Sequence, residues 1–281
     1  MEIVFDNVVV EANRNTLLSK ILVDGVNLNI EENKITAILG NSNSGKTVIG
    51  ELINAVVSPT SGKVFIGDYV NDGSRIKDIN FLRMSIGFVP QSPKDTFISK
   101  TVYKELLTGM EYFNYKSQKK AVRAEDAMKL VGLPENLKYE DPMKLSISEA
   151  RRLSIGCVLT FNPKVIILDE PSIGLNTRDI NNLIRLINLM KKRYKKTIII
   201  LSKDTDFLYK IAEEVIVMKE SKVIRSGGRE ILEDSSFLTN NNFKVPFSVS
   251  FVDMMKTKNN VIIDYSSDIK DIVKGVCRNV L

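Results

Sequence analysis

One segment of the sequence constrains the fold more than any other: residues 40–47 follow the pattern Gly-x-x-x-x-Gly-Lys-Thr. An apolar run at residues 35–39 precedes it, and a stretch compatible with a helix, residues 47–57, follows it. Glycines let such a loop curl so that successive backbone N–H groups point inward at phosphate oxygens, and the positive end of the helix dipole favours the same anion. We therefore expect a phosphate-binding loop made of Gly40, Asn41, Ser42, Asn43, Ser44, Gly45, Lys46 and Thr47.

Two side chains of this loop can act directly on a nucleotide. Lys46 is placed to reach the β- and γ-phosphates, and the hydroxyl of Thr47 is placed to hold Mg²⁺. The alternative interpretation is a glycine-rich turn with a chance lysine. The strand before the loop and the helix after it favour phosphate binding, because both elements are part of such a site.

A second motif supports the first. Residues 165–168 are apolar and end in Asp169 and Glu170, which predicts a buried parallel strand with two carboxylates at its end. Buried carboxylates are costly unless they meet a cation or a polar ligand. We expect Asp169 to hold Mg²⁺ and Glu170 to orient and deprotonate an attacking water. Taken alone, the pattern also fits a strand that runs into a solvated loop.

The order of these motifs resembles that of the ATPase subunits of ABC transporters. The corresponding segments are the Walker A loop (residues 40–47), the Q-loop (88–91), the signature motif (145–149), the Walker B strand (166–170), the D-loop (174–176) and the switch loop (201–204). Residues 91–97 and 244–253 are more narrowly similar to ATPases of energy-coupling factor (ECF) transporters, which import vitamins and transition-metal ions in prokaryotes. The resemblance covers nearly the whole chain.

The resemblance implies a subunit that binds and hydrolyses ATP with Mg²⁺. Gln91 is then expected to take part in catalysis and to contact the metal, while Ser146 and Ser148 are expected to contact the nucleotide held by an opposite subunit. The expected partners are a second ABC ATPase subunit, in a homodimer or a heterodimer, an integral membrane coupling subunit and a substrate-binding membrane subunit. The expected location is peripheral, on the cytoplasmic face of the cell membrane.

The signature motif departs from the family pattern. It usually reads Leu-Ser-Gly-Gly-Gln, whereas Ile147 and Ser148 replace both glycines here. Ile147 brings a stiff β-branched side chain to a surface at which glycine permits close approach to phosphate. Ser146 and Glu149 also match the pattern of an ordinary helix capping box. A helix start without nucleotide contact is therefore an equally good interpretation of this segment.

The switch loop departs as well. The chain contains no histidine, so Lys203 stands where the family usually has one. A protonated lysine has no acceptor lone pair and cannot replace a neutral imidazole. It can still meet a γ-phosphate as a point charge, so Lys203 is a candidate catalytic residue. The alternative for Lys203 is a solvated lysine after a strand.

Two further positions differ, and together the departures shape the functional hypotheses. Asn176 replaces the D-loop aspartate, and Ala12 lies near the usual position of an adenine-stacking aromatic, for which Phe5 is a poor substitute. Our main hypothesis is an asymmetric heterodimer in which the partner carries a conventional signature motif. The alternative is a regulatory or structural nucleotide-binding subunit with little hydrolysis of its own. No coiled coil, zinc motif or tandem cassette is visible in the sequence, which disfavours an ATPase acting on DNA or ribosomes.

Composition is that of a globular protein with one large or two small domains: 281 residues, 43% hydrophobic and 26% charged. We find no run of about 18 apolar residues and no signal-peptide pattern, and the two cysteines offer no disulfide framework, which fits a cytoplasmic setting. The net charge is +6. Because the basic run at residues 191–196 ends a predicted long helix, where cations complement the helix dipole, we expect no nucleic-acid partner.

Strand patterns that alternate with helical segments predict an α/β fold, a P-loop NTPase of ABC type with a mainly parallel core sheet. Residues 2–10 and 26–30 predict an antiparallel N-terminal sheet, residues 68–74 a turn-rich region, and residues 92–150 approximately a helical insertion. We expect a nucleotide-binding domain over residues 1–228 and a small C-terminal domain over residues 229–281, which the resemblance implies helps to pair two ATPases. Within the tail, residues 261–264 predict a short strand and residues 269–280 a helix.

Overall fold

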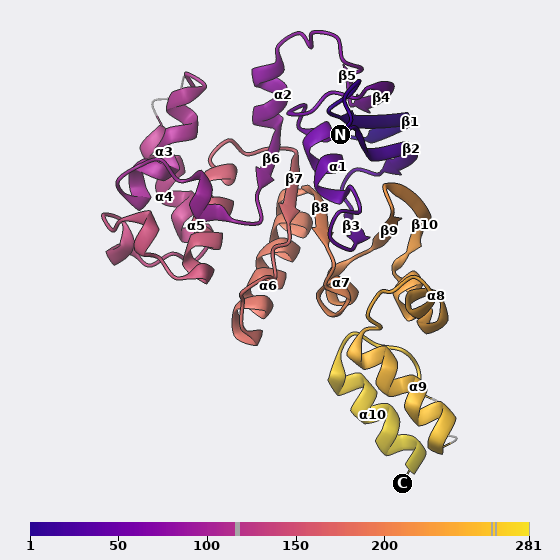
Figure 1. Cartoon of the computed structure of the whole chain (residues 1–281). Helices are drawn as coiled ribbons and strands as arrows, with labels where there is room; N and C mark the ends of the chain where they lie inside the picture. Colours follow the sequence, from indigo (N-terminus) through magenta and orange to yellow (C-terminus); the bar gives the residue numbers. More distant parts are fainter. Residues whose placement is uncertain (116–118, 260, 262, 281) are drawn as a thin grey trace.

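The computed structural model describes residues 1–115, 119–259, 261 and 263–280 (Figure 1). Among these residues, an antiparallel N-terminal sheet has the strand order β2-β1-β4-β5. Its strands are β1 (Ile3–Ala12), β2 (Lys20–Ile30), β4 (Ser61–Ile66) and β5 (Tyr69–Asn71). Side chains on one face of this sheet are buried against helix α1 (Lys46–Ile53) and the core sheet, which accounts for the alternating apolar pattern.

The core sheet has the order β10-β9-β3-β8-β7-β6 and is parallel except for the β9–β10 hairpin. Its strands are β3 (Ile35–Gly40), β6 (Ile86–Val89), β7 (Val165–Asp169), β8 (Thr197–Ser202), β9 (Glu214–Lys219) and β10 (Lys222–Gly228). Strands β3, β7 and β8 are buried along their whole length because both faces of the sheet are covered. Their carboxyl ends meet at one edge of the sheet, where ligands of such folds bind.

Helices complete the fold around this sheet. The helical insertion contains α3 (Val102–Tyr112), α4 (Lys120–Leu130) and α5 (Ile147–Leu159), which lie to one side of the sheets in Figure 1. Helices α6 (Thr177–Tyr194) and α7 (Thr205–Ile211) follow β7 and β8. Within the described part of the chain, no helix combines the length and the apolar content that crossing a bilayer requires.

The tail divides into two parts with different cores. Helix α8 (Ser235–Asn240), the segment after it and the first turn of the next helix contribute Leu238, Phe243 and Val249, in that order, to the large core beside the core sheet. Helices α9 (Phe247–Asn259) and α10 (Ile269–Val280) instead share a small core with Val252 and Ile272 at its centre. In Figure 1 this helical hairpin stands away from both sheets at the C-terminal end of the chain.

The predicted fold class is confirmed, with local differences. The turn-rich region at residues 68–74 contains β5, and the helix α2 (Ile79–Ser85) was not predicted. Both elements are short and depend on tertiary contacts: the buried Asn71 side chain of β5 donates to the carbonyls of Leu52 and Val57. The strand predicted at residues 261–264 is wrong for the described residues 261, 263 and 264, while Ile262 lies outside them. Ile263 is buried between α9 and α10 instead of pairing with another strand.

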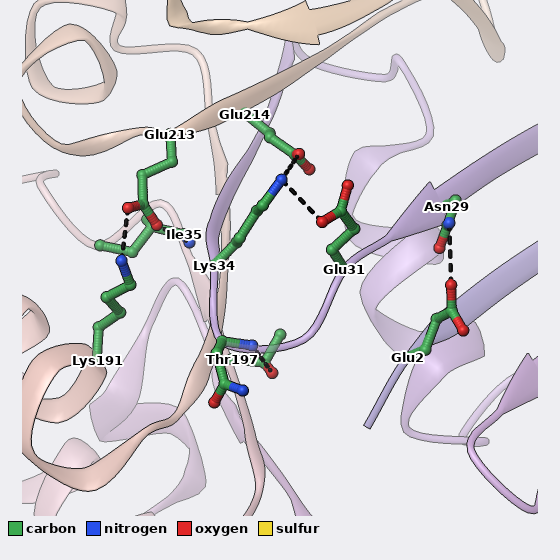
Figure 2. Close-up of polar contacts among 10 residues, drawn as sticks. Glu2, Asn29, Glu31, Lys34, Ile35, Lys191, Thr197, Glu213 and Glu214 are labelled. Atoms are coloured by element: carbon green, nitrogen blue, oxygen red, sulfur yellow. Dashed lines mark hydrogen bonds and ion pairs between the residues drawn. The ribbon is translucent and has the colours of Figure 1, made fainter.

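A charged network holds the amino ends of the core strands together (Figure 2). Lys34 Nζ lies 2.5 Å from a carboxylate oxygen of Glu214 at the start of β9. Glu213 accepts hydrogen bonds from Lys191 Nζ at 2.6 Å and from the backbone N–H of Ile35 at 2.9 Å. The basic end of α6 is therefore tied to β3 and β9, in agreement with our interpretation of residues 191–196 as a helix end.

We expect Glu213→Gln to lower the free energy of unfolding at pH 7 by about 0.5–1 kcal/mol, since the carboxylate is only partly buried. Burial raises the pKa of Glu213, but the hydrogen bonds from Lys191 and Ile35 and the positive charges of Lys191 and Lys34 lower it on balance. A lowered folded-state pKa stabilises the protein above the unfolded-state pKa, and this contribution is lost as the pH falls through the folded-state pKa.

Urea unfolding of both proteins at pH 7 and at acidic pH would measure this difference, which we expect to shrink toward acid. Lys222→Gln is the control, because it removes the more exposed Lys222–Asp24 pair and is expected to change stability by less than about 0.5 kcal/mol. If Glu213→Gln lowered the free energy of unfolding as much at acidic pH as at pH 7, the lowered pKa assigned to Glu213 would be wrong.

Candidate functional site

The loop between β3 and α1 can be built only with its two motif glycines. Gly45 has a φ of +93°, and a Cβ atom there would lie 2.4 Å from the carbonyl oxygen of Leu22. A Cβ atom on Gly40 would lie 2.2 Å from Ser44 Oγ. At Gly45 the backbone therefore approaches another backbone segment more closely than any larger residue allows, whereas at Gly40 the Ser44 side chain fills the space. The exposed residues of the loop are Asn41, Ser42 and Asn43.

The loop meets both carboxylates at the end of β7. Lys46 Nζ lies 3.2 Å from Glu170 Oε1 and donates to the carbonyl oxygen of Asn41 at 3.4 Å. Thr47 Oγ1 donates to Asp169 Oδ2 at 2.9 Å. Lys46, Asp169 and Glu170 are each less than 8% exposed. The structure thus brings Lys46, Thr47, Asp169 and Glu170 into one largely buried cluster.

Glu170 is held at both of its carboxylate oxygens. While Oε1 faces Lys46, Oε2 accepts a hydrogen bond from Ser202 Oγ at 2.9 Å and one from the backbone N–H of Lys203 at 3.3 Å. The backbone of Glu170 has a φ of +43°, in the left-handed region that non-glycine residues seldom adopt. Such strain persists only where the surroundings fix the residue, and it is concentrated at functional sites.

The cluster leaves one acceptor open for a cation. Asp169 Oδ1 is buried and has no hydrogen-bond partner among the described residues, and burial raises the pKa of this carboxyl group although Thr47 and Lys46 oppose the rise. Mg²⁺ is commonly bound by one or two carboxylates together with substrate phosphates. The open oxygen of Asp169 and the adjacent Thr47 hydroxyl therefore fit that ion.

A buried arginine adds a second positive charge, which the sequence analysis missed. Arg151 of α5 is 2% exposed and donates from Nη1 to the carbonyl oxygen of Pro90 at 3.0 Å, so it ties the helical insertion to the end of β6. Burial lowers its pKa, and the charges of Asp169 and Glu170 oppose that shift. Its position within a helical pattern gave no signal that it would face the carboxylates.

Two predicted catalytic side chains lie outside the buried cluster. Gln91 is exposed in the segment that follows β6, at the same edge of the sheet as Asp169. The side chain of Lys203 is also exposed, and its contact with Glu170 is made by the backbone N–H. The roles of both side chains stay predictions. Ser202, also missed, contacts Glu170 only because β7 and β8 are neighbours.

The signature segment forms the capping box that its sequence allows. Ser146 Oγ accepts a hydrogen bond from the backbone N–H of Glu149, and Glu149 accepts one from the backbone N–H of Ser146 at 2.9 Å. Ile147 is 56% exposed, and its side chain lies against Gly174 of the D-loop segment. Helix capping by Ser146 is confirmed, whereas nucleotide contact by Ser146 and Ser148 stays a prediction.

Comparison with known proteins agrees with this geometry. Residues 23–173 match the sequence family described as ABC transporter. The energy-coupling factor transporter ATP-binding protein EcfA2 of Clostridium acetobutylicum is 31% identical over 96% of this chain and 93% of its own length. EcfA2 of Mycoplasma capricolum is 28% identical over 97% of this chain and 98% of its own length.

Solved structures give the same result. The structure described as cbiO1 from Clostridium perfringens, part of the ABC transporter complex cbiONQ, is 30% identical with a TM-score of 0.74, over 89% of this chain and 98% of that one. The fold is also that of the dimeric ATP-binding cassette MJ0796 bound to ADP and Pi. That structure is 24% identical, with a TM-score of 0.74, over 81% of this chain and 98% of its own. The phosphate loop, the paired carboxylates and these matches show that the chain belongs to the ABC transporter ATPase family, among the ATP-binding proteins of energy-coupling factor transporters.

Proposed function

We propose that this chain energises an ECF-type importer of a micronutrient, a vitamin or a transition-metal ion, by binding and hydrolysing ATP with Mg²⁺. The observation that carries the proposal is the buried cluster in which Lys46 meets Glu170 and Thr47 meets Asp169. The names of the relatives support the transport role, and the peripheral location on the cytoplasmic face follows from it. The partners would be a second ATPase and the membrane subunits of the importer.

The chemistry is in-line attack of water on the γ-phosphate of ATP. An incoming triphosphate would take Lys46 away from Glu170, which frees Oε1 to accept a proton from water. Ser202 and the N–H of Lys203 would meanwhile hold Oε2 in place, so that the carboxylate keeps its orientation. Mg²⁺, held by Thr47 and Asp169 with Gln91 nearby, would neutralise charge on the phosphates.

Our proposal includes an asymmetric pair of ATPases. Residues 1–228 would form the nucleotide-binding domain and residues 229–281 a C-terminal domain that contributes to pairing. Ile147 projects from the start of α5, on the segment that would face the nucleotide of the partner. In a homodimer both sites would meet this bulky side chain, whereas in a heterodimer the partner can supply the two glycines to the site of this chain.

A second candidate function is a regulatory nucleotide-binding subunit that hydrolyses little ATP itself. The exposed Lys203 side chain, in place of histidine, and Ile147, in place of glycine, favour it. Glu170 opposes it, because a buried carboxylate in a strained backbone conformation is costly to retain without a role.

ATP turnover by the native membrane complex decides between these two functions. We expect Glu170→Gln in this chain alone to lower turnover by roughly 100-fold or more, because a neutral amide cannot act as a general base. Glu111→Gln, at an exposed position of α3, is the matched control and should have no effect. Unchanged turnover, with nucleotide still bound by this chain, would establish the regulatory function.

Restoring the family residues at the two altered positions should speed hydrolysis. We expect Ile147→Gly and Lys203→His each to raise ATP turnover of the complex. Turnover of the double variant should exceed that of either single variant by roughly tenfold, which corresponds to a barrier lower by about 1.4 kcal/mol. Turnover that stays constant in all three variants would show that these departures do not limit hydrolysis.

Asp169 gives a test of the proposed metal site that does not depend on turnover. Because burial raises the folded-state pKa of Asp169, ionising this carboxyl group costs more in the nucleotide-free folded chain than in the unfolded chain. We expect Asp169→Asn to raise the free energy of unfolding by about 1 kcal/mol while weakening Mg²⁺-dependent ATP binding by at least about tenfold.

Thermal unfolding without nucleotide and calorimetric titration with and without Mg²⁺ would measure the two effects. Asp72→Asn is the matched control, since hydrogen bonds from Ser74 lower the pKa of this exposed carboxyl group, and the change should not stabilise the protein. Equal ATP affinities of wild type and Asp169→Asn in Mg²⁺ would remove Asp169 from the metal site.

A further inference from the structure

The phosphate loop is in direct contact with the tail of the chain. Asn41 Nδ2 donates a hydrogen bond to the carbonyl oxygen of Asn242, 201 residues away, at 3.2 Å. Asn242 lies in a tight turn with a φ of +61°, and the next residue, Phe243, is 5% exposed in the large core. The acceptor is therefore presented by an anchored turn.

The same stretch of the tail also holds the helix that follows the switch segment. Asp206, in the first turn of α7, accepts hydrogen bonds from Lys244 Nζ at 2.7 Å and from the backbone N–H of Phe247 at 2.6 Å. Phe247 begins α9, so Asp206 satisfies one of the backbone N–H groups that a helix start leaves unpaired. We call residues 242–247 the strap.

Both attachments of the strap are connected through neighbouring residues to the ion pair between Lys46 and Glu170. On one side, Lys46 Nζ contacts both Glu170 and the carbonyl of Asn41, whose side chain reaches the strap. On the other side, Glu170 accepts from the N–H of Lys203, three residues before Asp206. A ligand that draws Lys46 away from Glu170 therefore also takes Lys46 from the carbonyl of Asn41, at the attachment between the phosphate loop and the strap.

The unit beyond the strap has room to move. Helices α9 and α10 have their own small core, and a cavity of about 620 Å³ lies between them and helices α6 and α7, lined in part by Asp206, Phe247 and Ile269. The Phe247 side chain is 65% exposed at this junction. Val249, near the start of α9, is buried in the large core, so a change at the strap reaches the hairpin through this anchored end of α9.

We propose that the strap positions the phosphate loop and the switch segment in the nucleotide-free chain, and that it loosens when a triphosphate takes Lys46. Occupancy of the site is thereby transmitted to helices α9 and α10. Asn41 and Asp206 act as positioning residues at the two attachments. This inference rests on the nucleotide site proposed above.

Linkage fixes the sign of the expected effects. If a nucleotide loosens the strap, then loosening the strap by mutation must tighten nucleotide binding by the same coupling factor. We expect Asp206→Ala to raise the affinity for the non-hydrolysable analogue AMP-PNP with Mg²⁺ by roughly fivefold, at the low end of common coupling factors. Asp206→Asn, which keeps an acceptor for the N–H of Phe247, should recover part of the wild-type affinity.

The measurements use the full-length chain: calorimetric titration with AMP-PNP and Mg²⁺, and hydrogen–deuterium exchange of the amides of residues 243–250. In the wild type the analogue should speed exchange in this segment, and in Asp206→Ala the exchange should already be fast. Lys210→Ala, at an exposed position of the same helix, is the matched control and should leave affinity and exchange unchanged. Lys244→Ala removes only the exposed ion pair with Asp206, and it replaces Asp206→Ala in both measurements if that variant does not fold.

The outcomes separate the two proposals. If the wild type binds AMP-PNP but neither its strap exchange nor the affinity of the Asp206 variants changes by more than about twofold, the strap is only a structural connection and the inference is wrong. If the wild type itself binds no nucleotide, the proposed function fails first.

Discussion

The structure depends on one contact above all, the buried ion pair between Lys46 and Glu170. The two side chains are 8% and 4% exposed, and their charged atoms lie 3.2 Å apart. Removing either charge would leave the other buried and unpaired, which commonly costs several kcal/mol. Buried pairs of this kind seldom improve stability over apolar residues, so their presence is better explained by chemistry than by folding.

The fold makes such a buried pair possible because buried strands end at one edge of the sheet. Strands β3 and β7 are completely buried, and each ends where the chain turns toward the site. The first helical turn after β3 supplies Lys46 and Thr47, and the end of β7 supplies the two carboxylates. Neighbouring elements then complete the charge balance, because Arg151 adds a second positive charge from the helical insertion.

The segments that depart from the family pattern lie at the surface of this cluster. Ile147 and the side chain of Lys203 are exposed, whereas Lys46, Asp169 and Glu170 are buried. The proposed nucleotide-binding cluster is therefore separate from the surface that would meet a second subunit. Substitutions on that surface can change pairing and hydrolysis without disturbing the buried charges, which is how an asymmetric pair could arise from two similar chains.

The sequence by itself determined the elements whose cause is local. The phosphate loop follows from glycines at fixed spacing, because only a residue without Cβ fits the left-handed backbone and the close contact with Leu22 at Gly45. The pattern at residues 269–280 also gave the correct bounds of α10. The short elements β5 and α2 escaped prediction, since they owe more to packing than to sequence pattern.

The tertiary structure alone decided which distant groups meet. Sequence patterns predicted that Thr47 and Asp169 would share one site, but their hydrogen bond, across 122 residues, is set by the packing of α1 against β7. The contacts of Ser202 with Glu170 and of Asn41 with Asn242 carry no sequence signal. The physical reason is that a local pattern reports the backbone conformation and the buried face of a segment, whereas the order of strands in a sheet selects its neighbours.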